Sequence, residues 1–353
     1  MMAPSRALVL LALTTLLGCA SPASEPARVS DLVAVDGGTG GAVAAPQADR
    51  RTWDAVSGRA TPIATRTPVA KPAEAVVPVL LFHSVCDVVC TPDDTYGITR
   101  ADLAAFLSWL GENAYTTIDS ATYARALRGD RAGLPPRPVL LTFDDGRSDA
   151  YAGADGLLLD AHAVATMFVI TGRPDGLAPG FMSWSDIVDA RASGRWDIQL
   201  HAANGHSQVA VGNADGGPVT APFFANRLFD THAYPLADAY LEPRALWQAR
   251  VRDDLARGIG ALRMHLGSFE PAAFAVPYGD YGQAQSNDPS LAGELRALFD
   301  ATFPVWFTQS LAVVAKPQTS HEQLRYYVLR TTAPADIEAW LLAMARVSAP
   351  AAP

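Results

Sequence analysis

The sequence has few charged residues, few cysteines and no basic tract. Charged residues make up 18% of its 353 residues, and the formal net charge is −9. A negative chain without a basic tract is not suited to polyanionic partners, so we expect no nucleic-acid partner. The chain also lacks internal repeats and heptads, which excludes solenoids and coiled coils. A hydrophobic content of 49% is instead typical of an ordinary globular core.

The N-terminus carries the features of an export signal. Arg6 precedes an apolar run over residues 7–17 that is too short to span a bilayer, which predicts a signal peptide over residues 1–18. The letters LLGC at 16–19 are similar to a bacterial lipobox, and that resemblance implies lipidation of Cys19. The alternative is an ordinary signal peptide cleaved near Ala20 or Ala23. We therefore expect an exported protein that a lipid anchors to a membrane of the cell envelope, in the outer membrane or periplasm if the cell is Gram-negative.

Two further cysteines, Cys86 and Cys90, lie four residues apart. An exported compartment permits a disulfide between them, and we expect it to close a short loop. A zinc site is the alternative, but no second pair of Cys or His residues lies at zinc-finger spacing.

The chain changes character after its first quarter. Residues 19–75 are rich in Ala, Pro, Gly, Ser and Thr and predict a flexible tether, and residues 348–353 form a short Ala/Pro tail. Between them, over residues 76–347, apolar runs alternate with amphipathic stretches. The predicted strands are 76–82, 138–143, 165–170, 196–200, 272–276, 301–307 and 326–329. The main predicted helices are 100–112, 120–127, 183–192, 243–266 and 333–347.

Alternating strands and helices predict an α/β fold with a parallel sheet. We favour a distorted seven-stranded (β/α) barrel over a doubly wound sheet. In such barrels the chemistry lies where strands end and the following loops begin.

A buried strand ends in two carboxylates at Asp144 and Asp145, in the motif PVLLTFDDG over residues 138–146. Neighbouring residues that leave a strand point in different directions, so one carboxylate can bind a metal while the other faces a substrate. An Asp that caps a helix would explain one of the two but not both.

A second strand ends in two histidines, His201 and His206. Gly205 lies between them, in a loop that can turn both imidazoles toward one ion. With Asp145 they would form a facial set that leaves open positions for water and substrate, as a catalytic metal site requires. Zinc fits this set, and cobalt or nickel would fit as well.

The motifs TFDDG at 142–146 and His201 with His206 resemble those of the polysaccharide deacetylases, also called carbohydrate esterase family four or the nodulation deacetylase homology family. The spacing of five between the histidines, where four is commoner, is similar to that of the poly-β-1,6-N-acetylglucosamine N-deacetylase branch. Further resemblances to that branch are PVLLFHS at 78–84, MSW at 182–184, ANRL at 225–228 and VPYG at 276–279. The resemblance implies a polysaccharide deacetylase domain over residues 76–347. It also implies that Asp144 is the catalytic base and that Asp145, His201 and His206 are the metal ligands.

Two positions depart from the family pattern. The third motif usually begins with an Arg that pairs with the catalytic Asp, whereas Ala275 and Val276 precede Pro277 here, and nothing obvious replaces the Arg. The fifth motif usually supplies a Leu-x-His acid, but residues 328–330 offer Arg330, which we expect among the substrate-binding or oxyanion residues. His83, at the end of the first strand, could protonate the leaving group or orient Asp144.

The resemblance implies hydrolysis of N-acetyl groups on an amino-sugar polysaccharide, with poly-β-1,6-N-acetylglucosamine the favoured substrate. It also implies an oxyanion contact from the backbone N–H near Tyr278, beside Pro277. Trp184, Tyr278 and Tyr281 could line a sugar groove or pack in the core. A polysaccharide export machinery is a candidate partner. The alternatives are a deacetylase of peptidoglycan, chitin or xylan, and a surface lipoprotein that binds a glycan without cleaving it.

Overall fold

The computed structural model describes residues 77–87, 95–175, 180–214, 217–230, 241–310 and 321–347. The chain divides into two units, Met1–Ala48 and Asp49–Pro353, and every described residue belongs to the second. The predicted signal peptide, Cys19, the tether, Cys90 and the tail lie outside the described residues. None of the described helices is both long enough and apolar enough to cross a membrane.

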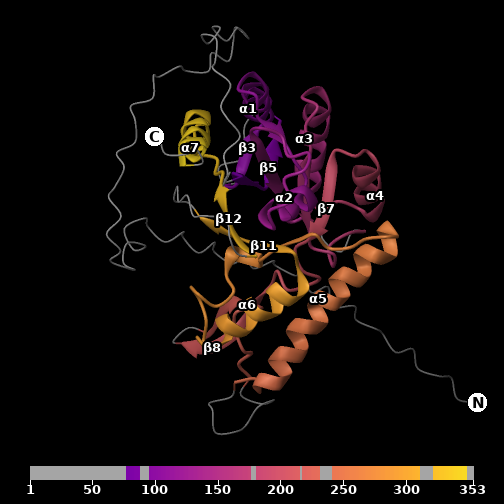
Figure 1. Cartoon of the computed structure of the whole chain (residues 1–353). Helices are drawn as coiled ribbons and strands as arrows, with labels where there is room; N and C mark the ends of the chain where they lie inside the picture. Colours follow the sequence, from indigo (N-terminus) through magenta and orange to yellow (C-terminus); the bar gives the residue numbers. More distant parts are fainter. Residues whose placement is uncertain are drawn as a thin grey trace, which may run out of the picture. The chain divides into compact units, whose positions relative to one another are not determined.

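Seven parallel strands form a closed barrel (Figure 1). In spatial order they are β1, β12, β11, β10, β7, β6 and β5, and pairing between β1 and β5 closes the ring. Their bounds are β1 Val79–Phe82, β5 Pro138–Phe143, β6 Ala165–Val169, β7 Trp196–Leu200, β10 Ala273–Ala275, β11 Val305–Ser310 and β12 Glu322–Tyr327. The predicted barrel is confirmed, and each of its seven strands overlaps a predicted one.

Four of the strands, β1, β5, β6 and β10, are buried along their whole length, which explains why they read as continuous apolar runs. On β5, Val139, Leu141 and Phe143 belong to the core between barrel and helices. The intervening Leu140 packs in a second core with Phe168 of β6. Because side chains alternate along a strand, the second core fills the inside of the barrel.

The described residues include seven α-helices around the barrel. They are α1 Arg100–Glu112, α2 Ser120–Leu127, α3 Ser148–Asp160, α4 Trp184–Ala192, α5 Arg244–Leu266, α6 Leu291–Thr302 and α7 Pro334–Val347. The sequence marks the start of α4 well, because Ser183 and Asp186 form a capping box. Tyr123 of α2 packs against Phe307 of the inner core and donates a hydrogen bond to Gln323 Oε1 at 3.1 Å. α2 therefore packs against the residues that fill the barrel.

Helices α3 and α6 were not among the predicted elements. Gly153 in α3 weakens the helical signal, but the fold needs it, because a Cβ there would lie 2.7 Å from the side chain of Val85. The strand predicted to begin at residue 301 begins at Val305, because α6 continues through Thr302. The strand predicted over 326–329 is Glu322–Tyr327, so the prediction missed its first four residues.

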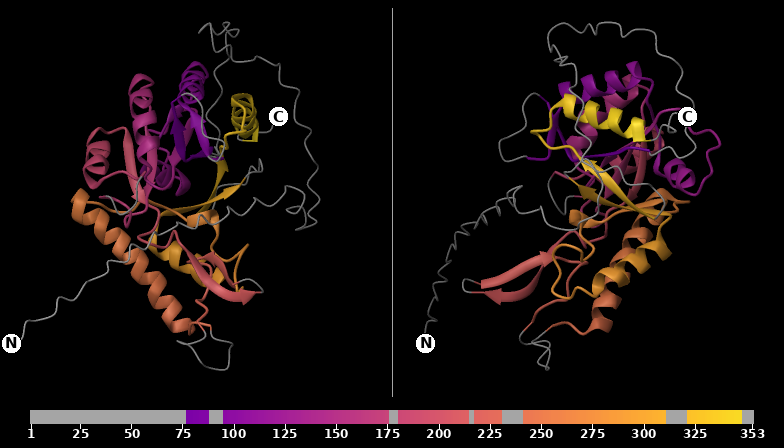
Figure 2. Two further views of the ribbon diagram at one scale, coloured as in Figure 1. Left: turned by 180° about the vertical axis from the view of Figure 1, so that it is seen from behind. Right: turned by 60° about the vertical axis from the view of Figure 1, so that its left-hand side comes forward.

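The described residues also include shorter strands outside the closed ring. β2 (Ser84–Cys86) pairs in parallel with β3 (Gly97–Thr99), and β4 (Thr116–Thr117) pairs with β5. β8 (Gln208–Ala214) and β9 (Gly217–Pro222) form an antiparallel hairpin that follows the histidine loop. Figure 2 shows this hairpin projecting away from the barrel strands.

Candidate metal centre

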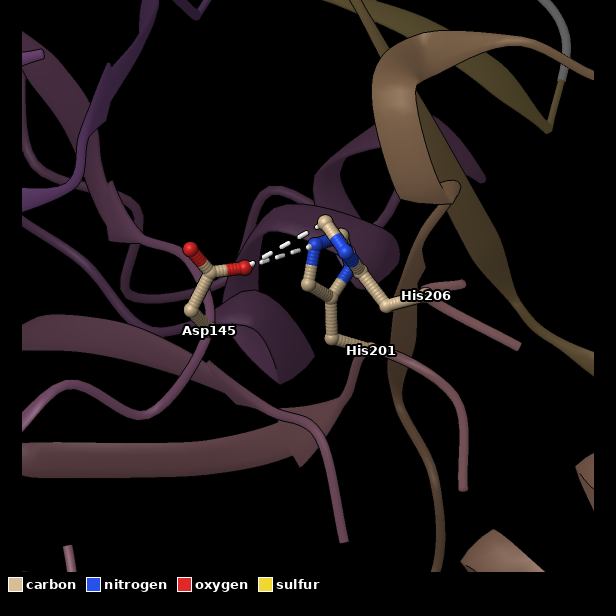
Figure 3. Close-up of side chains that lie close together, drawn as sticks. All are labelled: Asp145, His201 and His206. Carbon is tan, nitrogen blue, oxygen red and sulfur yellow. Dashed lines mark ion pairs between the residues drawn. The ribbon is translucent and has the colours of Figure 1, made fainter. Parts of the chain in front are cut away.

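The ends of β5 and β7 bring Asp145, His201 and His206 together (Figure 3). Asp145 Oδ1 lies 3.5 Å from His201 Nε2 and 3.4 Å from His206 Nε2. One ligand atom from each of the three residues lies within 4.8 Å of the other two. The carboxyl ends of parallel barrel strands meet at one rim, which explains why motifs 56 residues apart converge.

This group fits a divalent metal ion. Asp145 Oδ1 is buried and makes no hydrogen bond in the described part of the structure, so it is an acceptor with room for a cation. His201 Nδ1 lies 2.8 Å from the carbonyl oxygen of Ala275, a contact that leaves Nε2 as the nitrogen that can bind a metal. Two imidazoles and one carboxylate suit zinc and neighbouring divalent ions.

The pKa values of the three residues follow from burial and from one another. Burial alone would raise the pKa of Asp145, but His201, together with the charges that His83 and His206 can carry, holds it well below its usual range. Burial and the charge of His201 lower the pKa of His206 to about 4. Burial opposes protonation of His201 too, but the charge of Asp144 and the contact with Asp145 outweigh it and raise the pKa of His201.

Asp144 lies beside this group, and Arg325 binds its carboxylate. Arg325 Nη1 donates to Oδ1 at 2.6 Å and Nη2 donates to Oδ2 at 2.8 Å, and both side chains are buried. Burial alone would raise the pKa of Asp144, but Arg325 and then His201 outweigh burial and lower it. Asp144 is therefore ionised at neutral pH and can accept a proton.

Arg325 corrects the expectation that nothing replaces the Arg missing before Pro277. It comes from β12, which lies on one side of β1 while the β5 strand that carries Asp144 lies on the other. The only local signal is the register of β12, in which Gln323, Arg325 and Tyr327 alternate as its buried residues. A charged residue at a buried position of an amphipathic strand needs a partner, and here that partner is Asp144.

His83 follows β1, is half-buried, and lies close enough to Asp144 and Asp145 for their charges to act on it. Burial lowers the pKa of His83, and the two carboxylates oppose that change. Its Nε2 lies 3.4 Å from the Tyr327 hydroxyl, whereas its Nδ1 makes no hydrogen bond in the described residues. Since Arg325 already uses both oxygens of Asp144, orienting Asp144 does not require His83.

Tyr278 reaches the candidate metal centre from the end of β10. Its ring lies 4.5 Å from that of His206, and its hydroxyl donates to the His206 carbonyl oxygen at 3.3 Å. The preceding Pro277 is buried in the same turn. Three non-glycine residues at this rim have a positive φ, namely Asp145 at 73°, Ala202 at 98° and Tyr278 at 61°. Such strain costs about 1–3 kcal/mol per residue and is typical of functional sites.

Other residues singled out in the sequence have different surroundings. Trp184 stacks on His265 of α5, with ring centroids 3.9 Å apart. Tyr281 is buried against Trp306 and accepts a hydrogen bond from Arg296, which favours its core-packing interpretation.

Arg330 is exposed, and its backbone N–H donates to the carbonyl oxygen of Thr95. It lines a cavity of about 120 Å³ with residues of β3 and α1. Cys86 ends β2, and its predicted disulfide to Cys90 stays a prediction.

Comparison with known proteins shows similarity to polysaccharide deacetylases. The profile of the polysaccharide deacetylase family matches residues 131–293. The poly-β-1,6-N-acetyl-D-glucosamine N-deacetylase of Escherichia coli K12 is 27% identical over 186 residues, which are 49% of this chain and 26% of that protein. The chain thus aligns with about a quarter of the length of this relative.

Solved structures share the fold. A de-N-acetylase from Aggregatibacter actinomycetemcomitans has a TM-score of 0.59 at 20% identity and covers 75% of this chain and 99% of its own. IcaB from Ammonifex degensii has a TM-score of 0.53 at 24% identity and covers 77% of this chain and 98% of its own. The BpsB deacetylase domain from Bordetella bronchiseptica has a TM-score of 0.53 at 24% identity, covering 73% and 97%.

Proposed function

Because the chain belongs to the polysaccharide deacetylase family, we propose that it is a metal-dependent hydrolase that removes N-acetyl groups from an amino-sugar polysaccharide. One observation carries the proposal. The Asp145, His201 and His206 group lies beside an ionised carboxylate, Asp144, that is hydrogen-bonded to a buried arginine. A ligand set next to a fixed base is what metal-assisted hydrolysis requires.

Asp145, His201 and His206 would hold the ion. When bound, a divalent cation acts as a Lewis acid that polarises a carbonyl and lowers the pKa of a water molecule. Asp144 accepts the proton of the water that attacks the acetyl carbon, and the C–N bond breaks to give acetate and the free amine. The backbone N–H of Tyr278 is a candidate donor to the oxygen on which negative charge develops.

The departing nitrogen needs a proton, and His83 is our candidate donor. A histidine with a lowered pKa gives up a proton readily once it has one. Among the described residues, His83 Nδ1 makes no hydrogen bond, so this nitrogen is available to a substrate.

We propose poly-β-1,6-N-acetylglucosamine as the substrate, because the E. coli relative is a deacetylase of that polymer. The experiment is acetate release by the purified domain from β-1,6-linked N-acetylglucosamine oligomers, after chelation and after zinc, cobalt or nickel is restored. Release that stops with chelator and returns with metal supports the proposal. Chitin, peptidoglycan and xylan fragments are the comparison substrates, and preference for one of them would reassign the polymer.

A glycan-binding protein without catalysis is the second candidate. Its support is the two departures from the family pattern, the missing Arg before Pro277 and Arg330 in place of the Leu-x-His acid. Arg325 gives Asp144 a partner and so weakens the first of them. Glycan affinity without acetate release from any of the four substrates, with metal bound, would establish it.

We also propose that the protein is exported and lipid-anchored through Cys19, on the strength of the lipobox-like LLGC alone. Incorporation of a labelled fatty acid that is lost in Cys19→Ala would support the anchor. Secretion of an unlabelled, shortened chain would favour an ordinary signal peptide.

A further inference from the structure

The loop between the two histidines binds a carboxylate from a distant helix. Asp254 lies in α5 and is fully buried. Its Oδ2 accepts a hydrogen bond from the Ala203 N–H at 3.0 Å, and its Oδ1 accepts one from the Asn204 N–H at 2.8 Å. The Gly205 N–H also interacts with this carboxylate. Successive backbone N–H groups that converge on one anion form an anion-binding nest, and here the anion is supplied by the protein itself.

The opposite side of the same loop is held by the end of β6. The carbonyl oxygens of Ala202 and Ala203 accept hydrogen bonds from the N–H groups of Thr171 and Gly172, at 3.0 and 2.9 Å. The N–H groups of the loop thus bond to α5 while its carbonyl groups bond to the residues after β6. These backbone groups are thus hydrogen-bonded on both sides of the loop, which maintains the positive φ of Ala202.

Glycines allow this close approach. A Cβ on Gly258, one turn after Asp254 in α5, would lie 2.6 Å from Leu200 Cδ1 and 3.3 Å from the nitrogen of Ala203. A Cβ on Gly205 would lie 2.5 Å from the ring of Phe224 and 3.0 Å from Asp254 Oδ2. The helix, the loop and the Phe224 ring therefore fit together only when these two positions carry no side chain.

We propose that Asp254 is a positioning residue of the metal centre. By binding residues 203–205, it sets the path of the chain between His201 and His206, so that both Nε2 atoms reach Asp145 across a spacing of five. A buried carboxylate is costly unless its hydrogen bonds are made, so it opposes any movement of the loop away from α5. This inference rests on the metal site of the proposed function but not on the substrate.

The test measures metal binding directly. Asp254→Asn keeps the shape of the side chain, removes its charge and replaces one acceptor oxygen with a donor. The matched control is Asp253→Asn, because Asp253 is the neighbouring residue of α5, is largely exposed and pairs with Arg257 at 3.1 Å. The readouts are the zinc dissociation constant from chelator competition, the visible spectrum of the cobalt form, and the circular dichroism and Tm of the metal-free protein.

We expect Asp254→Asn to weaken zinc binding by about 10–100-fold, the usual effect of losing a group that orients metal ligands. The cobalt spectrum should change too, while Asp253→Asn stays within about twofold of the parent. A lower Tm with an unchanged zinc dissociation constant would assign Asp254 a purely structural role and overturn the inference. A parent protein that binds no zinc, cobalt or nickel would instead overturn the proposed metal site.

A second variant covers the case in which Asp254→Asn does not fold. Gly205→Ala keeps the buried carboxylate but pushes the loop away from Phe224 and Asp254. We expect it to weaken zinc binding as well. Parent-like zinc affinity in a folded Gly205→Ala protein would contradict the inference.

Discussion

Arg325 and Asp144 are 181 residues apart in the chain and form a buried pair with two hydrogen bonds. The guanidinium also lies over the rings of Phe168 and Phe307, at 5.3 and 5.8 Å from their centroids. Through Arg325, the proposed base Asp144 is thus connected to the side chains that fill the inside of the barrel. This pair gives Asp144 a fixed orientation and a lowered pKa without an Arg before Pro277.

Loss of the Arg325 guanidinium should affect both stability and the pH profile. Arg325→Met leaves the Asp144 carboxylate buried without its partner, which should lower the free energy of unfolding by about 3–5 kcal/mol. Because burial then raises the pKa of Asp144, the acid limb of kcat/KM should move to higher pH. Denaturant unfolding and a pH–rate profile measure the two effects. The control is Arg296→Met, which removes a partly exposed pair with Glu322 and a hydrogen bond to Tyr281 but leaves Asp144 untouched; equal effects in both variants would contradict a special role for Arg325.

The two adjacent aspartates should separate metal binding from turnover. Asp145→Asn removes a ligand and should lose metal and activity together. Asp144→Asn should retain zinc while kcat falls by about 10²–10⁴-fold, the range for loss of a general base. Metal analysis of the purified variants and acetate-release kinetics check both. Normal turnover in Asp144→Asn would refute the base assignment.

Metal affinity should depend on pH mainly through His201. Protons compete with the ion for imidazole nitrogens, and the pKa of His201 is raised whereas that of His206 is about 4. As pH falls through the raised pKa of His201, the zinc dissociation constant should increase by up to about tenfold per pH unit, corresponding to one displaced proton. His206 should add a second proton only near pH 4. Chelator competition between pH 8 and 5 gives the slope, and calorimetry in two buffers counts the protons; two protons displaced at pH 6 would contradict this assignment.

Loss of the His83 imidazole should slow amide hydrolysis more than ester hydrolysis. A departing amine needs a proton, whereas the leaving group of an aryl acetate does not, so an acid catalyst serves chiefly the first reaction. His83→Gln should therefore lower kcat for N-acetyl hydrolysis by about 10²–10⁴-fold and affect an aryl acetate much less. The control is Tyr327→Phe, which removes the hydroxyl 3.4 Å from His83 Nε2 but keeps the ring. Equal losses on amide and ester would mean that His83 acts on the attacking water or on the ligands instead.

The sequence alone predicted the barrel and the three residues that the structure brings together as a candidate metal-binding group. Buried strands have a recognisable apolar pattern, and the polar residues that follow β5 and β7 must meet at one rim because parallel strands end on the same side. Asp144, Asp145, His201 and His206 could therefore be named from two short motifs. The end of β1 identified His83 by the same reasoning.

Only the tertiary structure decided what supports those residues. Arg325 meets Asp144 because β12 and β5 both lie next to β1 in the closed ring, and Asp254 meets the histidine loop because Gly258 lets α5 approach it. Each contact joins side-chain or backbone groups far apart in the chain, with no local periodicity or spacing to mark the pairing. A local pattern specifies where an element begins and which face it buries, whereas the partner of a buried charge is specified by strand order and packing distance.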